Sequence, residues 1–506
     1  MIKRTAENRL VDWVKKKDRK PLVLRGARQV GKTTLVRQFA EKMGLELNEI
    51  NLERYLRLDD LFKSTNTERI CKELEAIAGR NIKGESSLLF LDEVQATPHA
   101  LKALRYFYEE VPSLPIIAAG SLLEFTLADH SFSMPVGRIE YLHLYPLTFS
   151  EFLSAVDPYL CSYLGSIEAN DIFPETGHIK LLERLREFFF IGGMPEAVKV
   201  YQESGSLSEV SAVHRSIVNT YTDDFSKYAR QQDLMLLQKV FNYIPRNLGR
   251  KVKYSNIDRD HRSSKIKDAI QLLTKARICH QIFHSSCSGL PLHAEIDENT
   301  YKLIFLDIGL ANHVCGLDWL AISSMIDQAL VNEGGLAEQF IGQHLIDSNL
   351  GLDPPRLQYW LREKKTTNAE IDYAISHGNW ILPVEVKAGK SGTLKSIHHF
   401  IHQKNSAIAI RFDLNPPSEQ EITCLVTTGG ASEPVSFLLI SLPLYTVESL
   451  SRVIEHRRKT VCKKCGKKMV IRTGPFSTFL GCSAFPQCDN KEKYQEPPEV
   501  KVNKDL

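Results

Sequence analysis

One short segment constrains the fold of this chain more than any other part of it. Residues 26–33 match the pattern G-x-x-x-x-G-K-[ST] at every fixed position, between an apolar run at residues 21–24 and a helical run that opens with Thr34. The eight residues are Gly26, Ala27, Arg28, Gln29, Val30, Gly31, Lys32 and Thr33. The glycines let the backbone curl so that successive N–H groups face one point, and the helix adds the positive end of its dipole. The segment therefore predicts a strand, an anion-binding turn and a helix in direct succession.

Residues 1–155 repeat this alternation of strands and helices. Short apolar runs at residues 21–24, 46–52, 88–91 and 115–119 are separated by stretches long enough for helices. Strands that are apolar on both faces and joined by crossover helices form a buried parallel sheet. The predicted fold class is α/β, and a chain of 506 residues has room for further domains.

The chemistry of the turn points to a nucleoside triphosphate held together with Mg²⁺. Lys32 is placed to reach the β- and γ-phosphates, and the Thr33 hydroxyl is placed to bind the magnesium ion. Two acids, Asp92 and Glu93, follow the apolar run at residues 88–91. We expect Asp92 to hold the magnesium ion through water and Glu93 to polarise the attacking water. The alternative is a chance glycine-rich turn, and a second motif on a matching strand argues against it. The predicted cofactors are ATP and Mg²⁺, in a site that extends from Gly26 to Thr34.

Several further segments resemble the bacterial and archaeal AAA+ ATPases that carry a C-terminal domain of unknown function. They are Leu91-Asp92-Glu93-Val94-Gln95, Ala119-Gly120-Ser121-Leu122-Leu123, Gly137-Arg138 before Leu144-Tyr145-Pro146-Leu147, Gly192-Gly193-Met194-Pro195-Glu196 and Phe305-Leu306-Asp307-Ile308-Gly309-Leu310. The resemblance extends from about residue 10 to about residue 447. It implies a P-loop AAA+ core at residues 1–155 and a helical lid at residues 156–230.

The resemblance also suggests roles for two weaker candidates. Ser121 follows the apolar run at residues 115–119, where AAA proteins place a polar residue near the γ-phosphate. Arg138 is a candidate for an arginine that reaches a neighbouring subunit and stabilises transition-state charge, which would require a homo-oligomer. A solvated surface arginine is an equally good interpretation of Arg138.

Residues 231–320 have the order of elements expected of a winged helix, which is helices followed by short strands. Basic residues outnumber acidic ones about threefold between residues 246 and 277. The basic residues include Arg246, Arg250, Lys251, Lys253, Arg259, Arg262, Lys265 and Lys267. The run from Ser263 to Leu273 has an apolar stripe and a serine placed to cap it, so it is a candidate recognition helix for DNA. The alternative is a solvated helix of the ATPase lid.

Residues 330–447 form a second α/β region with a pattern of acidic residues. Asp372 lies in one predicted strand, and Glu385 and Lys387 are two residues apart in the next, so both point to one face. With Glu338 on the preceding helix, they resemble the PD-(D/E)XK nuclease superfamily. The resemblance implies that Glu338, Asp372 and Glu385 bind Mg²⁺ and that Lys387 orients the attacking water. The alternative is a metal-binding domain that no longer cleaves and only binds DNA or a protein partner.

Residues 448–493 contain four cysteines at the spacing of a tetrahedral zinc site, namely Cys462, Cys465, Cys482 and Cys488. So small a segment needs Zn²⁺ in order to fold. It resembles the four-cysteine zinc fingers of type IA topoisomerases, which bind single-stranded DNA. Nearby lysines and arginines suit phosphates, and Phe476, Phe479 and Phe485 suit stacking on bases. The alternative is a structural ribbon with an aromatic core. Residues 494–506 are expected to be a disordered tail.

Composition and the N-terminal sequence limit where the chain acts and what it can bind. The net charge of +3 is small, so any DNA-binding surface must be local. The N-terminus lacks a signal peptide, no apolar run approaches a membrane span, and six scattered cysteines suit a reduced compartment, so a cytoplasmic location is expected. The leading hypothesis is an ATPase acting on DNA, with a magnesium nuclease domain, in DNA processing or defence. The competing hypotheses are a regulatory switch ATPase, whose inactive nuclease-like domain binds a protein partner, and a motor that remodels proteins.

Overall fold

The computed structural model describes residues 2–64, 66–84, 86–121, 123, 137–166, 174–317, 334–348, 356–362, 368–389, 393–428, 431–460, 462, 469–473 and 478–493. The predicted zinc ligand Cys465 and the predicted disordered tail at residues 494–506 lie outside these ranges. None of the described helices is both long and apolar enough to cross a bilayer.

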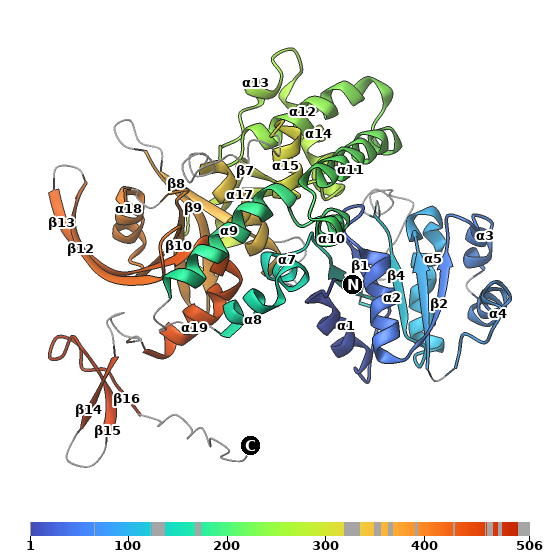
Figure 1. The fold of residues 1–506 in the computed structure, drawn as a ribbon, viewed down its shortest axis with the longest axis horizontal. Coiled ribbons are helices and arrows are strands. Elements are labelled where there is room, and N and C mark those ends of the chain that lie inside the picture. The colour runs from blue at the N-terminus through green and yellow to red at the C-terminus, as the bar shows by residue number, and fades with distance from the viewer. Residues whose placement is uncertain are drawn as a thin grey trace.

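The N-terminal part is a five-stranded parallel sheet in the order β2-β3-β4-β1-β5. Its strands are β1 (Leu22–Arg25), β2 (Glu46–Asn51), β3 (Ser87–Asp92), β4 (Ile116–Ala119) and β5 (Glu140–His143). Its helices are α1 (Ala6–Val14), α2 (Lys32–Met43), α3 (Leu58–Lys63), α4 (Thr67–Ala78) and α5 (Pro98–Glu110). Every residue of β1, β3 and β4 is buried, as expected for strands covered on both faces. The predicted parallel α/β sheet is confirmed, and it forms the blue lobe in Figure 1.

A group of helices follows the sheet and lies between it and the rest of the chain (Figure 1). They are α7 (Phe149–Val156), α8 (Pro158–Ser166), α9 (Glu175–Ile191), α10 (Pro195–Ser204) and α11 (Leu207–Tyr228). Helix α7 begins with a capping box in which Thr148 and Glu151 bond each other's backbone N–H groups. The predicted helical region after the sheet is therefore present.

The winged segment, residues 231–305, joins the next sheet rather than standing apart from it. It comprises α12 (Leu234–Arg246), α13 (Tyr254–Ile257), α14 (Ser263–Lys275) and the antiparallel strands β6 (Cys279–Ser285) and β7 (Ile296–Phe305). This is the predicted order of elements, but β6 also pairs in parallel with β8 (Gln358–Arg362). The expectation of a capping serine is wrong: Ser263 is the first helical residue, the N-cap is Arg262, and no side chain caps the helix.

The second sheet has eight strands in the order β12-β13-β11-β10-β9-β8-β6-β7. Its remaining strands are β9 (Ala369–His377), β10 (Trp380–Val386), β11 (Ile408–Asp413), β12 (Ser418–Thr428) and β13 (Ala431–Pro443). Helices α15 (Ile308–Val314), α17 (Gly334–Ser348), α18 (Lys395–Lys404) and α19 (Leu450–Thr460) accompany it, and β14 (Met469–Thr473), β15 (Thr478–Cys482) and β16 (Lys491–Lys493) form a separate small sheet. The predicted winged segment and the predicted nuclease-like region thus share one sheet.

Two motifs of the AAA+ resemblance, far apart in the sequence, meet in the core. The fully buried Asp307 caps α15, and its carboxylate accepts hydrogen bonds from the backbone N–H of Gly193 at 2.6 Å and of Leu310 at 3.0 Å. A Cβ atom on Gly192, which has φ 69°, would lie 2.1 Å from the same carboxylate. Burial raises the pKa of Asp307 to about 6. Gly192 is therefore required for the close approach between the end of α9 and the start of α15.

A buried histidine ties α17 to α7. His344 accepts a hydrogen bond from the Phe149 backbone N–H at Nε2 (2.9 Å) and donates from Nδ1 to the Phe340 carbonyl (2.7 Å). The Nε2 atom can accept only while the ring is neutral, and burial lowers the pKa of His344 from 6.5 to about 4.

We expect this histidine to weaken the fold as the pH falls. The unfolded chain takes up a proton below pH 6.5, whereas the folded chain does so only near pH 4, so protonation favours unfolding between these values. Over that window each pH unit costs about 1.4 kcal/mol of stability. The measurement is urea unfolding at several pH values for the wild type and His344→Gln. Other buried groups titrate in the same range, so the difference between the two proteins isolates His344. Parallel pH profiles would contradict the assignment.

Candidate nucleotide site, acid cluster and zinc ribbon

The backbone of the glycine turn adopts the conformation that its sequence predicts. Gly26 and Gly31 have φ values of 154° and 92°, and a Cβ atom on Gly26 would lie 2.3 Å from the Leu144 carbonyl oxygen. Lys32 is buried at the start of α2, and its ammonium donates to the carbonyl oxygens of Gly26 at 3.1 Å and Ala27 at 2.8 Å. Burial lowers the pKa of Lys32 to about 8. The ammonium is thus held at the centre of the turn.

The two acids at the end of β3, its last residue Asp92 and the following Glu93, lie beside the turn. The Thr33 hydroxyl donates to Asp92 at 2.9 Å, so a hydroxyl and a carboxylate, both hard oxygen ligands of the kind Mg²⁺ takes, are adjacent. Burial raises the pKa of Asp92, and the bond from Thr33 opposes that shift. Glu93 has a left-handed backbone (φ 53°), and its carboxylate accepts a hydrogen bond from the Gln95 side chain. These donors fit a magnesium ion bound with a triphosphate.

Gln95 is a site residue that the sequence indicated only as part of a family motif. Besides bonding Glu93, its side chain packs against the turn after β4, because a Cβ atom on Gly120 would lie 2.3 Å from the Gln95 Oε1 atom. The next residue, Ser121, is buried. Gln95 therefore links the acid expected to polarise water to the strand end that carries Ser121.

Two arginines tie the glycine turn to neighbouring elements, one from within the turn and one from outside it. Arg28, inside the turn, forms an ion pair with Asp224 of α11 at 2.5 Å, and the Tyr221 hydroxyl of the same helix donates to the Arg28 carbonyl at 2.7 Å. Arg4, just before α1, donates to the Val30 carbonyl at 3.0 Å. The turn is thus in direct contact with the helices that follow the first sheet.

Arg138 lies on the surface at the start of the segment that leads into β5. Its guanidinium pairs with Glu109 of α5 at 3.0 Å, and the side chain is 46% exposed. That contact agrees with a surface arginine. A role in a neighbouring subunit's site remains a prediction.

The residues predicted for a nuclease site lie close together but are already paired. Asp372 and Glu385 lie on the neighbouring strands β9 and β10, and Asp372 accepts a hydrogen bond from the Val386 backbone N–H at 2.7 Å. Lys387 forms an ion pair with Glu385. Burial, followed by the charge of Asp372, raises the pKa of Glu385 to about 8, and the same two causes raise the pKa of Glu338 well above its ordinary value.

Lys302 of β7 is a member of this acid cluster that sequence reasoning missed. Its ammonium is paired with Glu338 at 3.2 Å, with Glu370, and with Asp372 at 3.9 Å. The only signal was a lysine inside the apolar run 301–305. Among the described residues, three or more metal-ligand atoms lie within 4.8 Å of one another only in the cysteine cluster, so the acids in this arrangement do not fit a divalent cation.

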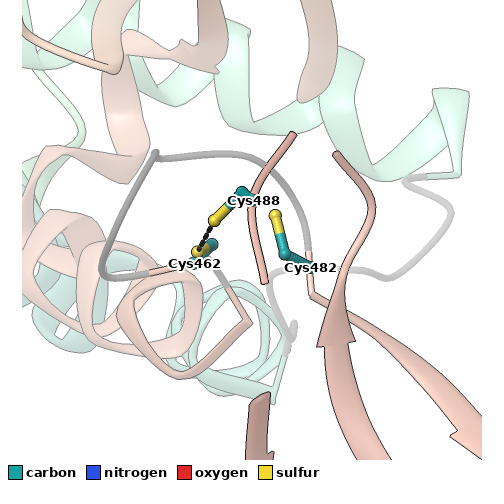
Figure 2. A group of neighbouring side chains, drawn as sticks. All are labelled: Cys462, Cys482 and Cys488. Atoms are coloured by element: carbon teal, nitrogen blue, oxygen red, sulfur yellow. Dashed lines mark hydrogen bonds between the residues drawn. The ribbon is translucent and has the colours of Figure 1, made fainter. Parts of the chain in front are cut away.

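Three of the four predicted zinc ligands converge. The sulfur atoms of Cys462, Cys482 and Cys488 all lie within 4.8 Å of one another, and those of Cys462 and Cys488 are 3.6 Å apart (Figure 2). Zn–S bonds of about 2.3 Å in a tetrahedron place the sulfur atoms about 3.8 Å apart. The three buried thiols therefore fit zinc, and they would hold it as the structural centre of the ribbon.

Phe476 lies outside the described residues, and the two described phenylalanines of the ribbon, Phe479 and Phe485, are not part of its buried core. The core consists of the three cysteines and Met469, with Leu480 and Ala484 packed against them. Phe485 is 53% exposed, and the Arg472 guanidinium lies 5.5 Å from its ring centre. The Lys491 ammonium lies 5.5 Å from the ring centre of Phe479. This arrangement of rings and cations suits contact with a nucleic-acid strand.

The fold and these sites indicate an AAA-type domain, followed by a second α/β domain and a zinc ribbon. Comparison with known families agrees and confirms the predicted resemblance. Residues 18–153 match an AAA domain, and residues 333–445 match a domain of unknown function, DUF4143. Residues 182–321 match a further domain of unknown function, DUF8612. Residues 459–497 match the topoisomerase DNA binding C4 zinc finger.

Individual relatives match only parts of the chain. An uncharacterized protein of Methanocaldococcus jannaschii, MJ1637, is 29% identical over 39% of this chain and 40% of its own length. The uncharacterized protein YrdD of Escherichia coli is 52% identical over 6% of this chain and 18% of its own length. The matches therefore span less than half of either relative.

Two solved structures share 12% identity with the chain. PCH-2 of C. elegans has a TM-score of 0.27 and is covered over 65% of its length, against 41% of this chain. A signal transduction ATPase with a tetratricopeptide repeat sensor from Pyrococcus horikoshii has a TM-score of 0.25, with 45% of its length and 68% of this chain covered. Scores this low carry no argument about function.

Proposed function

We propose that this chain binds and hydrolyses ATP at the glycine turn and uses that turnover to act on DNA, in DNA processing or in defence. The observation that carries the first half is the grouping of Lys32, Thr33, Asp92 and Glu93 at the carboxyl ends of the parallel strands. The second half is supported by the topoisomerase-type zinc ribbon and by the exposed aromatic and basic side chains on it.

The residues of the nucleotide site divide the chemical work. Lys32 contacts the β- and γ-phosphates, while the Thr33 hydroxyl and Asp92 hold Mg²⁺, which neutralises the charge of the phosphates when it is bound. Glu93, held by Gln95, orients and polarises the attacking water. Ser121 lies near the γ-phosphate, and Arg138 serves a neighbouring subunit if the chain forms a homo-oligomer.

The winged segment offers a second surface for DNA. At the start of α14 and in the turn before it, Arg259, Arg262 and Lys265 are exposed. Ile266, Ala269, Ile270 and Leu273 pack the other side of the helix into the core. The basic side chains therefore face solvent, where they can contact phosphates, and salt should weaken this contact.

Replacing the exposed aromatic of the ribbon should weaken binding to single-stranded DNA. We expect Phe485→Ala to lower affinity about tenfold, because stacking on one base contributes about 1–3 kcal/mol. Gel shifts with a labelled single-stranded oligonucleotide provide the measurement. The matched control is Tyr159→Ala, which removes an aromatic side chain that is 90% exposed and far from the ribbon in sequence. Equal affinities of the two variants and the wild type would contradict a stacking role.

Metal-dependent DNA cleavage is a second candidate function. It would be carried by Asp372 and Glu385 on neighbouring strands, by Lys387 directly after β10, and by Glu338 beside them. The competing proposal is a regulatory switch, in which this domain is inactive and binds a protein partner. Incubation of plasmid and single-stranded DNA with the protein, with and without Mg²⁺ and ATP, distinguishes them. Cleavage that is lost in both Asp372→Ala and Lys387→Ala supports a nuclease, and intact DNA under all conditions supports the switch.

A further inference from the structure

The winged segment inserts a buried cation into the acid cluster of the second sheet. Lys302 is 3% exposed, although it lies in an otherwise apolar strand run. Its ammonium lies 5.1 Å from the centre of the Tyr359 ring. A lysine is rarely buried so completely unless acids pair with it, so its partners explain its position.

The number of carboxylates around Lys302 equals the number of N–H donors on its ammonium. The group has three N–H donors, and three carboxylates lie around it, those of Glu338 on α17 and of Glu370 and Asp372 on β9. Two of these, Glu338 and Asp372, are the acids that the sequence assigned to Mg²⁺. The third predicted ligand, Glu385, is paired with Lys387. The cluster therefore contains four acids and two lysines, and every acid in it has an ammonium partner.

The backbone of the winged segment also closes over the cluster. Gly249, after α12, has φ 71°, and a Cβ atom there would lie 2.7 Å from the Glu338 Oε1 atom. The backbone of the neighbouring Lys251 forms an isolated antiparallel β-bridge with that of Lys302, and the Val252 N–H donates to the Tyr301 carbonyl at 2.9 Å. Lys302 and the cover over Glu338 thus come from the same segment, which carries the exposed basic residues of α14.

A divalent ion and the Lys302 ammonium need the same oxygen atoms. Mg²⁺ requires oxygen ligands at about 2.0–2.1 Å in near-octahedral geometry. The described acid oxygens do not gather in that way, and a metal ion among them would be repelled by the adjacent ammonium. Occupancy by Lys302 and occupancy by a metal are therefore mutually exclusive.

We propose that Lys302 is the resident cation of the acid cluster and takes the place of a divalent metal there. Binding of a metal at Glu338 and Asp372 is then blocked by a side chain that the winged segment supplies. The inference concerns metal binding and does not depend on whether the domain cleaves DNA.

The test is Mn²⁺ binding by calorimetry and by the electron paramagnetic resonance signal of free Mn²⁺, with the zinc-loaded full chain and no nucleotide. We expect Lys302→Met to gain one Mn²⁺ site at least tenfold tighter than any in the wild type. The double variant Lys302→Met, Asp372→Asn should lose that site. The matched control is Lys239→Met, which removes a lysine paired with Asp258 in the same segment and should gain nothing.

The outcomes that overturn the proposal are direct. They are a wild-type Mn²⁺ site that disappears in Asp372→Asn, or a folded Lys302→Met variant that binds no more Mn²⁺ than the wild type does. If circular dichroism shows that Lys302→Met does not fold, the wild type and Asp372→Asn decide the question. Equal Mn²⁺ binding by those two proteins supports the proposal, and weaker binding by Asp372→Asn overturns it. The absence of DNA cleavage would affect only the second candidate function.

Discussion

Lys32→Ala should reduce the rate of ATP hydrolysis about a thousandfold. The Lys32 ammonium is buried in the glycine turn and held by the carbonyl oxygens of Gly26 and Ala27. In the proposed site, it would face the charge that develops on the γ-phosphate. Removing one preorganised group that stabilises such charge costs about 10²–10³ in rate, and this lysine also contributes to binding the nucleotide. Phosphate release under saturating ATP and Mg²⁺ measures the effect, and a fluorescent ATP analogue separates loss of binding from loss of turnover.

A matched control comes from the same helix. Arg37 of α2 is exposed and its guanidinium pairs with Glu49, while the charge of Asp92 acts on it without a hydrogen bond or ion pair. Arg37→Ala therefore removes a positive charge without removing a described contact to the turn. A surface ion pair contributes about 0–1 kcal/mol, so this variant should fold and hydrolyse ATP like the wild type. If Lys32→Ala and Arg37→Ala both turned over ATP at the wild-type rate, the assignment of the nucleotide site would be wrong.

Cys482→Ser should release zinc and unfold the ribbon while leaving the rest of the chain folded. Among the described residues, the ribbon core consists of three cysteines and three small or medium apolar side chains, and so small a core cannot stabilise a fold alone. Structural zinc contributes about 10–16 kcal/mol of binding energy in small domains, so loss of one thiolate removes most of the folding energy. Zinc content by atomic emission and limited proteolysis measure the two effects.

The control for that variant is another cysteine. Cys424 lies on β12, is partly buried and belongs to no described metal cluster, so Cys424→Ser should keep one zinc ion per chain. The Cys482→Ser protein should also lose affinity for single-stranded DNA and keep its ATP hydrolysis in the absence of DNA. Full zinc content and a protease-resistant ribbon in Cys482→Ser would show that the cysteines do not form the site.

The parts of the fold that follow from local sequence could be predicted. Strands β1, β3 and β4 of the first sheet could be predicted because each is a short run of mostly apolar residues, whereas β5 has no such run and was not predicted. The glycine turn could be predicted because it combines two glycines, a lysine and a threonine at fixed spacing. The proximity of Asp372 and Glu385 is predictable for the same reason, because adjacent antiparallel strands are joined by a short turn. In each case, the residues that meet are close in sequence or lie at the same edge of one sheet.

The contacts that could not be predicted from the sequence join segments that are far apart along the chain. The pairing of β6 with β8 crosses about seventy residues, and nothing in either strand specifies its neighbour. Lys302 meets Glu370 only because of that pairing, and Asp307 meets Gly193 across 114 residues. The sequence showed a lysine in an apolar strand and a conspicuous glycine pair, but the position of their partners depends on the packing of whole elements.

The most direct test of the account is the effect of DNA on ATP hydrolysis. Phosphate release by the full chain should be measured with and without single-stranded and duplex DNA, for the wild type and Cys482→Ser. The account predicts that DNA raises the wild-type rate severalfold and that single-stranded DNA has no such effect on Cys482→Ser. A wild-type rate that is the same with and without DNA would contradict the claim that ATP turnover serves an action on DNA.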